Sequence, residues 1–366
     1  MKFRVCVLGQ PFIVSLDNSL DAGLQATIVD QWRHLQSPAS DAAVETFHLT
    51  IAQLSNTDAP GSTLIVARDA EHAPDLLASR LTLAGIRELV GAAFMFHASG
   101  LATTDGRVVA LVGPSGRGKT TAALALGQSM GYVTDETVSF RTDLSVIPFA
   151  KPLSIGRRPG IKKLSSPMDL GMRVATEPLR LASLVLLDRR IEPIEPRVDT
   201  VDLLEALGEL AEQTSSLAQL PHPLLALTDV VAATGGVKRF VYSDADDLMG
   251  LVTVLLEAPP VRHPVITEVA MESHAPTQVG NFGRRPFIDA LLIDERLVIL
   301  TEGKLHVLDG IGPNLWMEAN DTSLVEITER LLESLGVPPP GVNLVETVAA
   351  AVDALLEANL LVRKDE

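Results

Sequence analysis

The stretch that decides the fold of this 366-residue chain reads Gly113-Pro114-Ser115-Gly116-Arg117-Gly118-Lys119-Thr120, followed by Thr121. It fits the Walker A pattern, G-x-x-x-x-G-K-[ST], in full. Glycines let main-chain N–H groups turn inward around an anion without Cβ clashes. A helix that follows directs the positive end of its dipole at the same point. The pattern therefore predicts a loop, made by all nine residues, that holds the phosphates of a nucleotide.

The residue types at the end of this loop predict two cofactors, ATP and Mg²⁺. Lys119 is expected to reach the β- and γ-phosphates, and the Thr120 hydroxyl is expected to coordinate Mg²⁺. The flanking sequence agrees with this interpretation. Residues 108–112 predict a short buried strand, and residues 121–130 predict a helix rich in Ala and Leu. An earlier strand is expected over residues 93–102, before a turn at Asp105-Gly106.

Two adjacent acids, Asp135 and Glu136, follow one helix after Lys119, within residues 132–140 that read as a strand. If this strand and the one before the loop are parallel neighbours, their carboxyl ends meet at one edge of the sheet, where open α/β sheets place ligands. A carboxylate there holds Mg²⁺ or accepts a proton from an attacking hydroxyl. The alternative is an exposed acidic pair at a strand end.

The rest of the first 258 residues reads as alternating strands and helices. Residues 1–90 show no chemistry and are expected to form an accessory lobe, with Trp32 as a core residue. The apolar run 181–187, which ends at Asp188, is typical of a central buried strand. Helices are expected over 203–220 and 245–256.

The wording around the loop also occurs in ABC-transporter ATPases, and residues 184–188 would pass as a Walker B strand. Those ATPases carry a Leu-Ser-Gly-Gly-Gln helix, however, and no such signature occurs here. A different resemblance covers more of the chain. It is carried by Phe96-His97-Ala98-Ser99-Gly100-Leu101, by Asp105-Gly106, by the Walker A loop and by Gly131-Tyr132-Val133-Thr134-Asp135-Glu136.

Together these segments resemble the HPr kinase/phosphorylase-like group, which belongs with the PEP-carboxykinase-like P-loop folds. The resemblance is sharp over residues 93–155 and weaker to about 257. It implies phosphoryl transfer from a nucleotide to a serine hydroxyl, with Lys119 and Asp135 as catalytic residues and Asp135 as the general base. It also implies that Glu136 and Thr120 serve the metal, Thr120 in place of the usual serine, and that His97 lines the nucleotide site. A core histidine is the alternative for His97.

One departure concerns the substrate. Residues 141–190 do not show the segment with which HPr kinases bind their protein substrate, so HPr itself is not expected here. A basic island in an acidic chain comprises Lys151, Arg157, Arg158, Lys162 and Lys163. It would neutralise phosphate or grip an acidic substrate, although a solvated loop is the alternative. Lys151 is kept as a candidate because it follows the Asp135 strand.

The C-terminal region begins a new pattern. Residues 259–286, rich in Pro, Gly, His and Thr, read as a linker. Three short strands are expected over 287–293, 296–300 and 304–308, followed by three helices. Residues 290–308, Asn314-Leu315-Trp316 and 345–361 resemble the PqqD-like family. This resemblance implies a small winged-helix-like α+β domain that binds precursor peptides, which an edge strand within 297–308 would accept by β-augmentation.

Charge and composition exclude several functions. The net charge is −16, so the chain is not expected to bind nucleic acid or an anionic membrane. From Arg285 onward, six basic residues face fifteen acidic ones, which argues against a DNA-binding winged helix. A lone Cys6 makes no intrachain disulfide. No secretory signal and no apolar segment of membrane-spanning length is visible, so a cytoplasmic location is expected.

These observations predict four regions: an accessory α/β region (1–90), a P-loop HPr-kinase-like α/β domain (91–258), a linker (259–286) and a PqqD-like domain (287–366). The leading hypothesis is an ATP- and Mg²⁺-dependent serine kinase that acts on a peptide or small protein recruited by the C-terminal domain. The alternative is a nucleotide-dependent peptide-binding or chaperone protein that transfers no phosphate. A kinase for a small metabolite is a third option, and homo-oligomerisation is compatible with all three.

Overall fold

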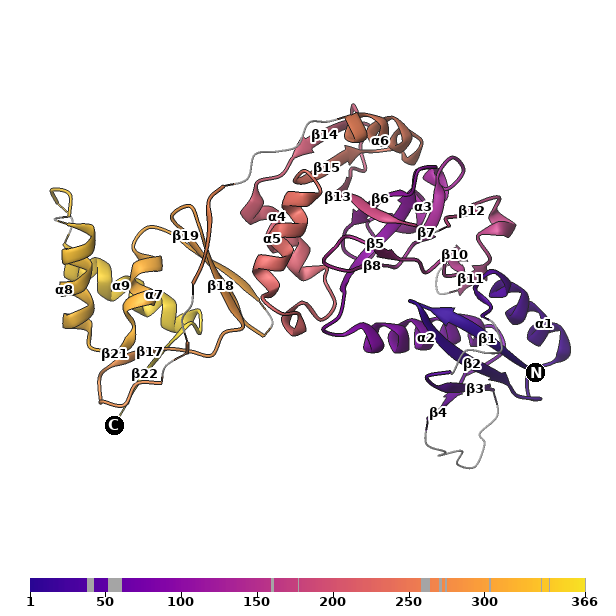
Figure 1. Cartoon of the computed structure of the whole chain (residues 1–366), viewed down its shortest axis with the longest axis horizontal. Coiled ribbons are helices and arrows are strands. Elements are labelled where there is room, and N and C mark those ends of the chain that lie inside the picture. Colours follow the sequence, from indigo (N-terminus) through magenta and orange to yellow (C-terminus); the bar gives the residue numbers. More distant parts are fainter. Residues whose placement is uncertain are drawn as a thin grey trace. The chain divides into compact units, whose positions relative to one another are not determined.

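A computed structural model describes residues 1–37, 43–51, 61–158, 161–176, 178–257, 264–269, 272–273, 275–302, 304–336, 338–341 and 343–365, without the side chains of 157–158 and 161–162. The fold is mixed α/β, with several sheets and nine α-helices in these ranges. The chain divides into two compact units (Figure 1). The first comprises Met1–Pro221 and Asp229–Val261, and the second Arg262–Glu366 with His222–Thr228.

The chain begins with a four-stranded sheet in the order β1-β2-β3-β4. Its strands are β1 (Lys2–Val7), β2 (Gln10–Leu16), β3 (Thr46–Thr50) and β4 (Ser62–Val66), with helices α1 (Ala22–Gln31) and α2 (Ala73–Leu89). The β1–β2 pair is antiparallel, and the other two pairs are parallel. Trp32 is fully buried in the core of this sheet, as the sequence predicts.

The same hydrophobic core extends into the segments around the Walker A loop. Met95, Ile147, Phe149 and Leu164 belong to the buried cluster of the N-terminal sheet. The Gln31 amide also donates a buried hydrogen bond of 2.8 Å to the Leu164 carbonyl. The N-terminal lobe is therefore packed against the following domain in one compact unit.

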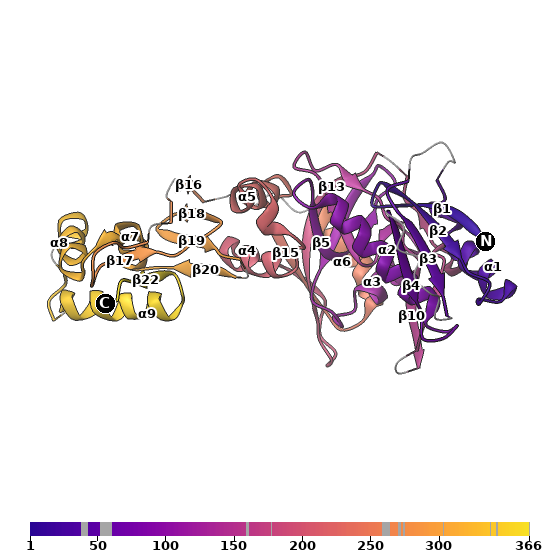
Figure 2. The same ribbon diagram turned by 90° about the horizontal axis from the view of Figure 1, so that it is seen from below.

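A larger sheet follows, in the order β12-β7-β5-β6-β13-β15-β14. Its strands are β12 (Arg173–Val174), β7 (Gly131–Thr134), β5 (Phe94–Ala102), β6 (Arg107–Val112), β13 (Arg180–Arg189), β15 (Val237–Tyr242) and β14 (Arg197–Thr200). The predicted central strand is confirmed, because β13 lies between β6 and β15, parallel to both. Helices α3 (Lys119–Leu126) and α6 (Leu248–Glu257) share one core with this sheet (Figure 2).

The strand pairing around the acids differs from the expected parallel neighbours. Antiparallel β5 lies between β6 and β7. The reason is the tight turn at Asp105-Gly106, where Gly106 has φ 82°, so that β5 and β6 form a hairpin and no crossover helix fits between them. Because β6 and β7 are both antiparallel to β5, they still run in the same direction, and their carboxyl ends reach the same edge.

Other predicted elements are shorter than expected. Residues 132–140 form two strands, β7 and β8 (Thr137–Phe140), and the break between them falls at Asp135 and Glu136. Helix α3 ends at Leu126, with Gly127 as its C-cap residue. Gly127 packs so closely that an added Cβ would lie 2.1 Å from Met172 Cε. Further strands and α-helices are β9 (Val146–Ile147), β10 (Leu153–Arg158), β11 (Ile161–Ser165), α4 (Leu203–Glu212) and α5 (Pro223–Ala233). Residues 223–228 of α5 belong to the second unit and its later residues to the first. Helix α4 is thus also shorter than the predicted 203–220.

Within residues 262–366, the described part of the second unit contains two small sheets and three α-helices. One sheet has the order β16-β18-β19-β20 and the other β21-β17-β22. The strands are β16 (Ile266–Glu268), β18 (Asp289–Ile293), β19 (Arg296–Leu300), β20 (Leu305–Leu308), β21 (Asn320–Thr322), β17 (Phe282–Arg284) and β22 (Leu361–Arg363). The helices are α7 (Gly312–Glu318), α8 (Leu324–Leu335) and α9 (Leu344–Glu357). Three hairpin strands and three helices thus occur where the sequence predicts them.

The expected linker is the exception, because β16 and β17 lie within residues 259–286. Each has only three residues, too few to show a period in the sequence, and β17 is stabilised by the distant strand β22. The buried Arg284 at its end donates to the main-chain oxygens of Met317 (2.7 Å) and Ala319 (3.3 Å), and its guanidinium lies 5.5 Å from the Trp316 ring centroid. Trp316 is fully buried and belongs to the core of this unit.

Within the part of the chain that the structure describes, no helix combines the length and the apolar character needed to cross a bilayer.

Candidate functional site

The Walker A loop connects the carboxyl end of β6 to the first turn of α3. Two of its glycines adopt positive backbone angles that other residues rarely adopt: φ is 83° at Gly116 and 92° at Gly118, the residue that caps α3. The buried Ser99 of β5 fixes the helix start, because its hydroxyl donates a 2.9 Å hydrogen bond to the Lys119 carbonyl. The strand, the loop and the helix therefore form one unit set by local sequence.

Lys119 folds back over this loop. Its ammonium donates to the main-chain oxygens of Gly113 (2.6 Å) and Pro114 (3.0 Å), and the residue is 6% exposed. Burial lowers the pKa of Lys119 to about 8, although Asp135 and Glu136 act to raise it. The ammonium is thus hydrogen-bonded to two neutral carbonyls of the loop. A bound anion would replace these bonds with a stronger, charge-assisted hydrogen bond.

The break between β7 and β8 brings Asp135 to the beginning of α3. The Thr120 hydroxyl donates a 3.0 Å hydrogen bond to Asp135 Oδ2. The Tyr132 hydroxyl lies 3.1 Å from Asp135 Oδ1 and 2.9 Å from the Lys151 carbonyl. Burial is the main reason why the pKa of Tyr132 lies well above its ordinary value, and the negative charge of Asp135 raises this pKa further. The Tyr132 hydroxyl therefore stays protonated and remains a hydrogen-bond donor. The buried Asp135 is therefore oriented from both sides.

Glu136 and Lys151 form the next contact along the site. The Lys151 ammonium lies 2.6 Å from Glu136 Oε2 and 3.8 Å from Asp135 Oδ1. The Lys151 side chain is 7% exposed and the Glu136 side chain 35%. Burial opposes the charge of Lys151, but Asp135, Glu136 and Asp75 together raise its pKa, so the lysine stays protonated.

The N-terminal lobe supplies a further wall of the site. Asp75, in the first turn of α2, accepts a 2.7 Å hydrogen bond from the Ser154 hydroxyl of β10. Asp75, Ala78 and Ser79 of α2 line the same cavity as Lys119 and Lys151. Residues 1–90, in which the sequence shows no chemistry, thus contribute α2 to the lining of this cavity, which the sequence did not predict. The reason is that α2 lies some forty residues before the loop and shows no local motif.

A cavity of about 480 Å³ joins these groups. It is lined by Asp75, Ala78, Ser79, His97, Ser115, Gly116, Gly118, Lys119, Thr120, Thr121, Asp135, Glu136, Lys151 and Ser154. Most of the predicted site residues thus meet in one place. Gly113 and Pro114 contribute carbonyls to Lys119, while Arg117 is exposed and does not line the cavity.

His97 borders the cavity from β5, and its neighbour Ala98 pairs with Val112, the last residue before the loop. Burial and the charge of Lys119 lower the pKa of His97, so the imidazole is neutral at pH 7. Of the basic island, Lys151 is part of the site and Lys163 is exposed on β11. The side chains of Arg157, Arg158 and Lys162 lie outside the described residues.

The residues present fit a magnesium ion that arrives with a nucleotide. Mg²⁺ takes oxygen ligands and is held by one or two carboxylates together with substrate phosphates and water. Thr120 and Asp135 supply a hydroxyl and a carboxylate oxygen 3.0 Å apart at the end of the Walker A loop. Among the described residues, no group of three or more His, Cys, Asp or Glu side chains is arranged to hold a metal by itself.

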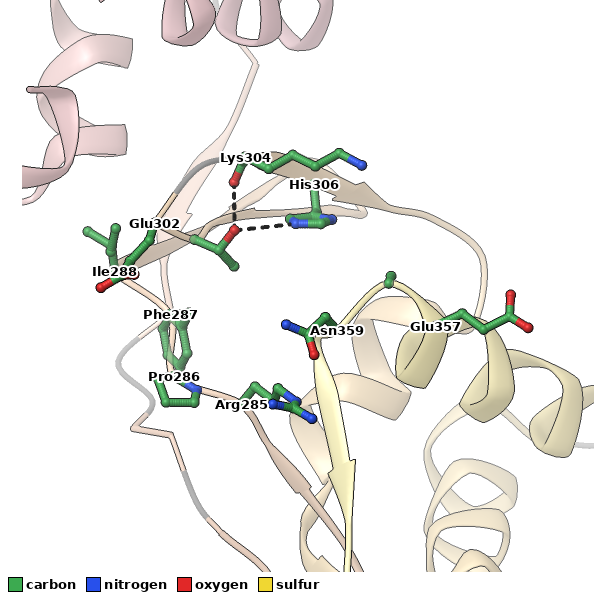
Figure 3. A pocket seen from close by; sticks show the side chains of 11 residues that line it. Arg285, Pro286, Phe287, Ile288, Glu302, Lys304, His306, Glu357 and Asn359 are labelled. Carbon is green, nitrogen blue, oxygen red and sulfur yellow. Dashed lines mark hydrogen bonds between the residues drawn. The ribbon is translucent and has the colours of Figure 1, made fainter. Parts of the chain in front are cut away.

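A second cavity, of about 790 Å³, lies in the second unit (Figure 3). It is lined by Arg285, Pro286, Phe287, Ile288, Thr301, Glu302, Lys304, His306, Glu357, Ala358 and Asn359. Strand β20 pairs only with β19 in the described sheet, so it is an edge strand, and the cavity runs beside it at the end of α9. The Thr301 hydroxyl donates to the Lys304 carbonyl (3.1 Å) and lies 3.4 Å from His306 Nε2.

Comparison of the chain with models of known protein families gives no match, and comparison with curated proteins gives none.

Sequence reasoning missed Tyr132, Asp75 and Ser154 as members of the first site. The position of Tyr132, three residues before Asp135 in a predicted strand, could have indicated a contact between the two side chains. A tyrosine at that position is equally typical of a hydrophobic core, however. Asp75 and Ser154 come from segments that only the packing of α2 against β10 and β11 brings to the loop.

Proposed function

We propose that the first unit is an ATP- and Mg²⁺-dependent phosphotransferase that transfers the γ-phosphate to a serine hydroxyl. The observation that carries the proposal is the contact of Thr120 with Asp135 at 3.0 Å, beside Lys119, in a cavity of about 480 Å³. This contact joins the Walker A loop to an oriented carboxylate. The resemblance to HPr kinase-like proteins supports the same reaction class.

The contacts favour a division of roles between the two acids that is the reverse of the one the resemblance implies. Asp135 is 3% exposed and bonded to Thr120, the expected metal residue, which suits the metal side of the site. The Glu136 carboxylate is more exposed, and in the described structure it makes no hydrogen bond to the Walker A loop. This position suits a base that receives the proton of an incoming serine hydroxyl. In the proposal, Asp135 therefore orients the metal end, and Glu136 accepts the proton of the serine.

The second unit supports a peptide or small protein as the acceptor. Among the described strands, β20 pairs only with β19, so its other side suits an added strand, and the adjoining cavity of about 790 Å³ offers room for side chains. The lining mixes Arg285 and Lys304 with Glu302 and Glu357, which suits polar contacts along a main chain. In the proposal, the PqqD-like second unit recruits the peptide that the first unit phosphorylates.

The direct test uses labelled ATP and serine-containing peptides encoded by neighbouring genes. The wild type is expected to transfer the γ-phosphate to a peptide serine in the presence of Mg²⁺. Lys119→Ala is expected to abolish both binding and transfer, whereas Glu136→Gln should keep MgATP binding and lose transfer. A wild type that binds MgATP, transfers nothing and binds no peptide defeats the kinase assignment.

The alternative is a nucleotide-dependent peptide-binding protein. The observation that favours it is the edge strand β20 beside a cavity of about 790 Å³, because an edge strand binds a peptide by strand addition without phosphate transfer. The same variants separate the two functions. If peptide binding responds to MgATP, is lost in Lys119→Ala and is unchanged in Glu136→Gln, nucleotide binding matters and base chemistry does not.

A further inference from the structure

A buried lysine inside a nucleotide-sized cavity requires a reason. Lys151 lines the cavity of the Walker A loop with its ammonium 2.6 Å from Glu136 and 3.8 Å from Asp135. Burial of the Lys151 ammonium costs hydration that its attraction to the half-buried Glu136 often fails to restore, so this contact is poor support for stability alone. A ligand that uses the charge supplies the missing reason.

The position of this ammonium is set by its own main chain. The Lys151 N–H donates to the Phe149 carbonyl at 2.6 Å, and the Lys151 carbonyl lies 2.9 Å from the Tyr132 hydroxyl. Pro152 follows directly and restricts the backbone further. The lysine therefore enters the cavity from a fixed stem, and its ammonium approaches Asp135 Oδ1, whereas Thr120 bonds Asp135 Oδ2.

The charges of the cavity show what the lysine does. Its lining contains three carboxylates, those of Asp75, Asp135 and Glu136, and two lysines, Lys119 and Lys151. With Lys119 alone, a polyphosphate would meet three negative groups and one positive group. The second ammonium offsets this repulsion at the end of the cavity that holds the acids, where the last phosphate of a nucleotide would lie if the Walker A loop holds the others.

We propose that Lys151 is a ligand of the γ-phosphate and makes the cavity select ATP over ADP. This inference rests on the proposed nucleotide site. Lys119 binds the same phosphates as the Walker A loop, and Lys151 contacts the terminal phosphate from the opposite side. In doing so, Lys151 exchanges part of its bond with Glu136 for a bond with the phosphate. That exchange also releases the Glu136 carboxylate for the incoming hydroxyl.

The experiment measures the ratio of two dissociation constants by calorimetry on the full chain, Kd for MgADP divided by Kd for MgATP. Lys151→Met is expected to lower this ratio about tenfold or more, since a charge-assisted hydrogen bond to phosphate is lost. Glu136→Gln leaves the lysine free for the phosphate, so the ratio should stay at the wild-type value or rise. Lys163→Met, an exposed lysine of the neighbouring strand β11, is the matched control and should leave the ratio unchanged.

Because Lys151→Met leaves two carboxylates without their cation, the double variant Lys151→Met/Glu136→Gln guards against simple unfolding. It removes both charges of the pair and should show the same loss of selectivity, with an unfolding midpoint near that of the wild type. A ratio within twofold of wild type in the double variant overturns the proposal, and Lys151 is then a structural partner of Glu136. In that case MgATP binding by the wild type still upholds the nucleotide site, whereas a wild type that binds neither nucleotide overturns both.

Discussion

Lys119 is the residue whose charge state should govern nucleotide affinity. Burial holds its pKa at about 8 in the free chain, below the ordinary value of a lysine, and bound phosphates would raise it again. Below pH 7 the ammonium is already formed, so this group adds no pH dependence. Above pH 8 binding must first add a proton, and we expect the Kd for MgATP to rise by up to about tenfold per pH unit, because one proton is taken up.

Calorimetry between pH 7.5 and 9.5 checks this slope, with Lys119→Arg as the control. The guanidinium stays protonated throughout this range, so its affinity, even if weaker, should show no such slope. An equal slope in both proteins would assign the titration to another group.

Tyr132 is expected to contribute to stability through its hydroxyl. Tyr132→Phe removes the donor shared by Asp135 and the Lys151 carbonyl, which leaves a buried acceptor without its partner. We expect a loss of about 1–2 kcal/mol in the free energy of unfolding, measured with urea. Tyr242→Phe is the matched control, since the Tyr242 hydroxyl makes no hydrogen bond within the described part of the chain; equal losses in the two variants would contradict the account.

At the scale of the element, the strand, loop and helix around Gly118 depend on backbone angles. Gly118→Ala places a Cβ at φ 92° and 3.5 Å from Arg189 Cδ, and should cost about 1–2 kcal/mol of stability and weaken MgATP binding. Gly208→Ala, in the middle of α4 with open space around the added Cβ, should instead stabilise by about 0.5–1 kcal/mol. Thermal unfolding measures the stability of both variants, and calorimetry measures MgATP binding by Gly118→Ala. A stabilising Gly118→Ala would contradict the loop geometry.

Some of these elements could be predicted from the sequence and others could not. The loop and the turn at Gly106 were predictable because their chemistry is local: glycines at positive φ, an apolar strand before the loop and a helix after it. The pairing of β5 between β6 and β7 was not, because a run of apolar residues carries no strand order. Strand β17 escaped prediction for a related reason, since its three residues are ordered by β22 at the other end of the unit.

At the scale of the whole molecule, each compact unit contains one of the two tryptophans, which makes their responses separable. Trp32 reports on the first unit and Trp316 on the second, and both are buried. In a Trp316→Phe variant, the fluorescence of Trp32 follows the unfolding of the first unit. MgATP at about 100 times its Kd should raise the free energy of this unfolding by about 2.7 kcal/mol. In a Trp32→Phe variant the shift should be smaller, because the proposed nucleotide site lies in the first unit. Equal shifts would contradict this assignment.

The site as a whole could be predicted only in part, for reasons of distance along the chain. Lys119, Thr120 and Asp135 lie within seventeen residues, and a motif with one following helix is enough to bring them together. Asp75 reaches the same cavity from α2, held by Ser154 of β10 at 2.7 Å. That contact depends on the packing of the N-terminal lobe against the following domain, which no local pattern encodes.

Nucleotide binding by the Walker A loop is tested most directly by calorimetric titration of MgATP into the full chain and into its Lys119→Ala variant. We expect one saturable site per chain in the wild type and a loss of affinity of at least about a hundredfold in the variant, since a buried charge-assisted contact to the phosphates disappears. No binding heat in the wild type, or an affinity that Lys119→Ala leaves unchanged, would contradict this expectation.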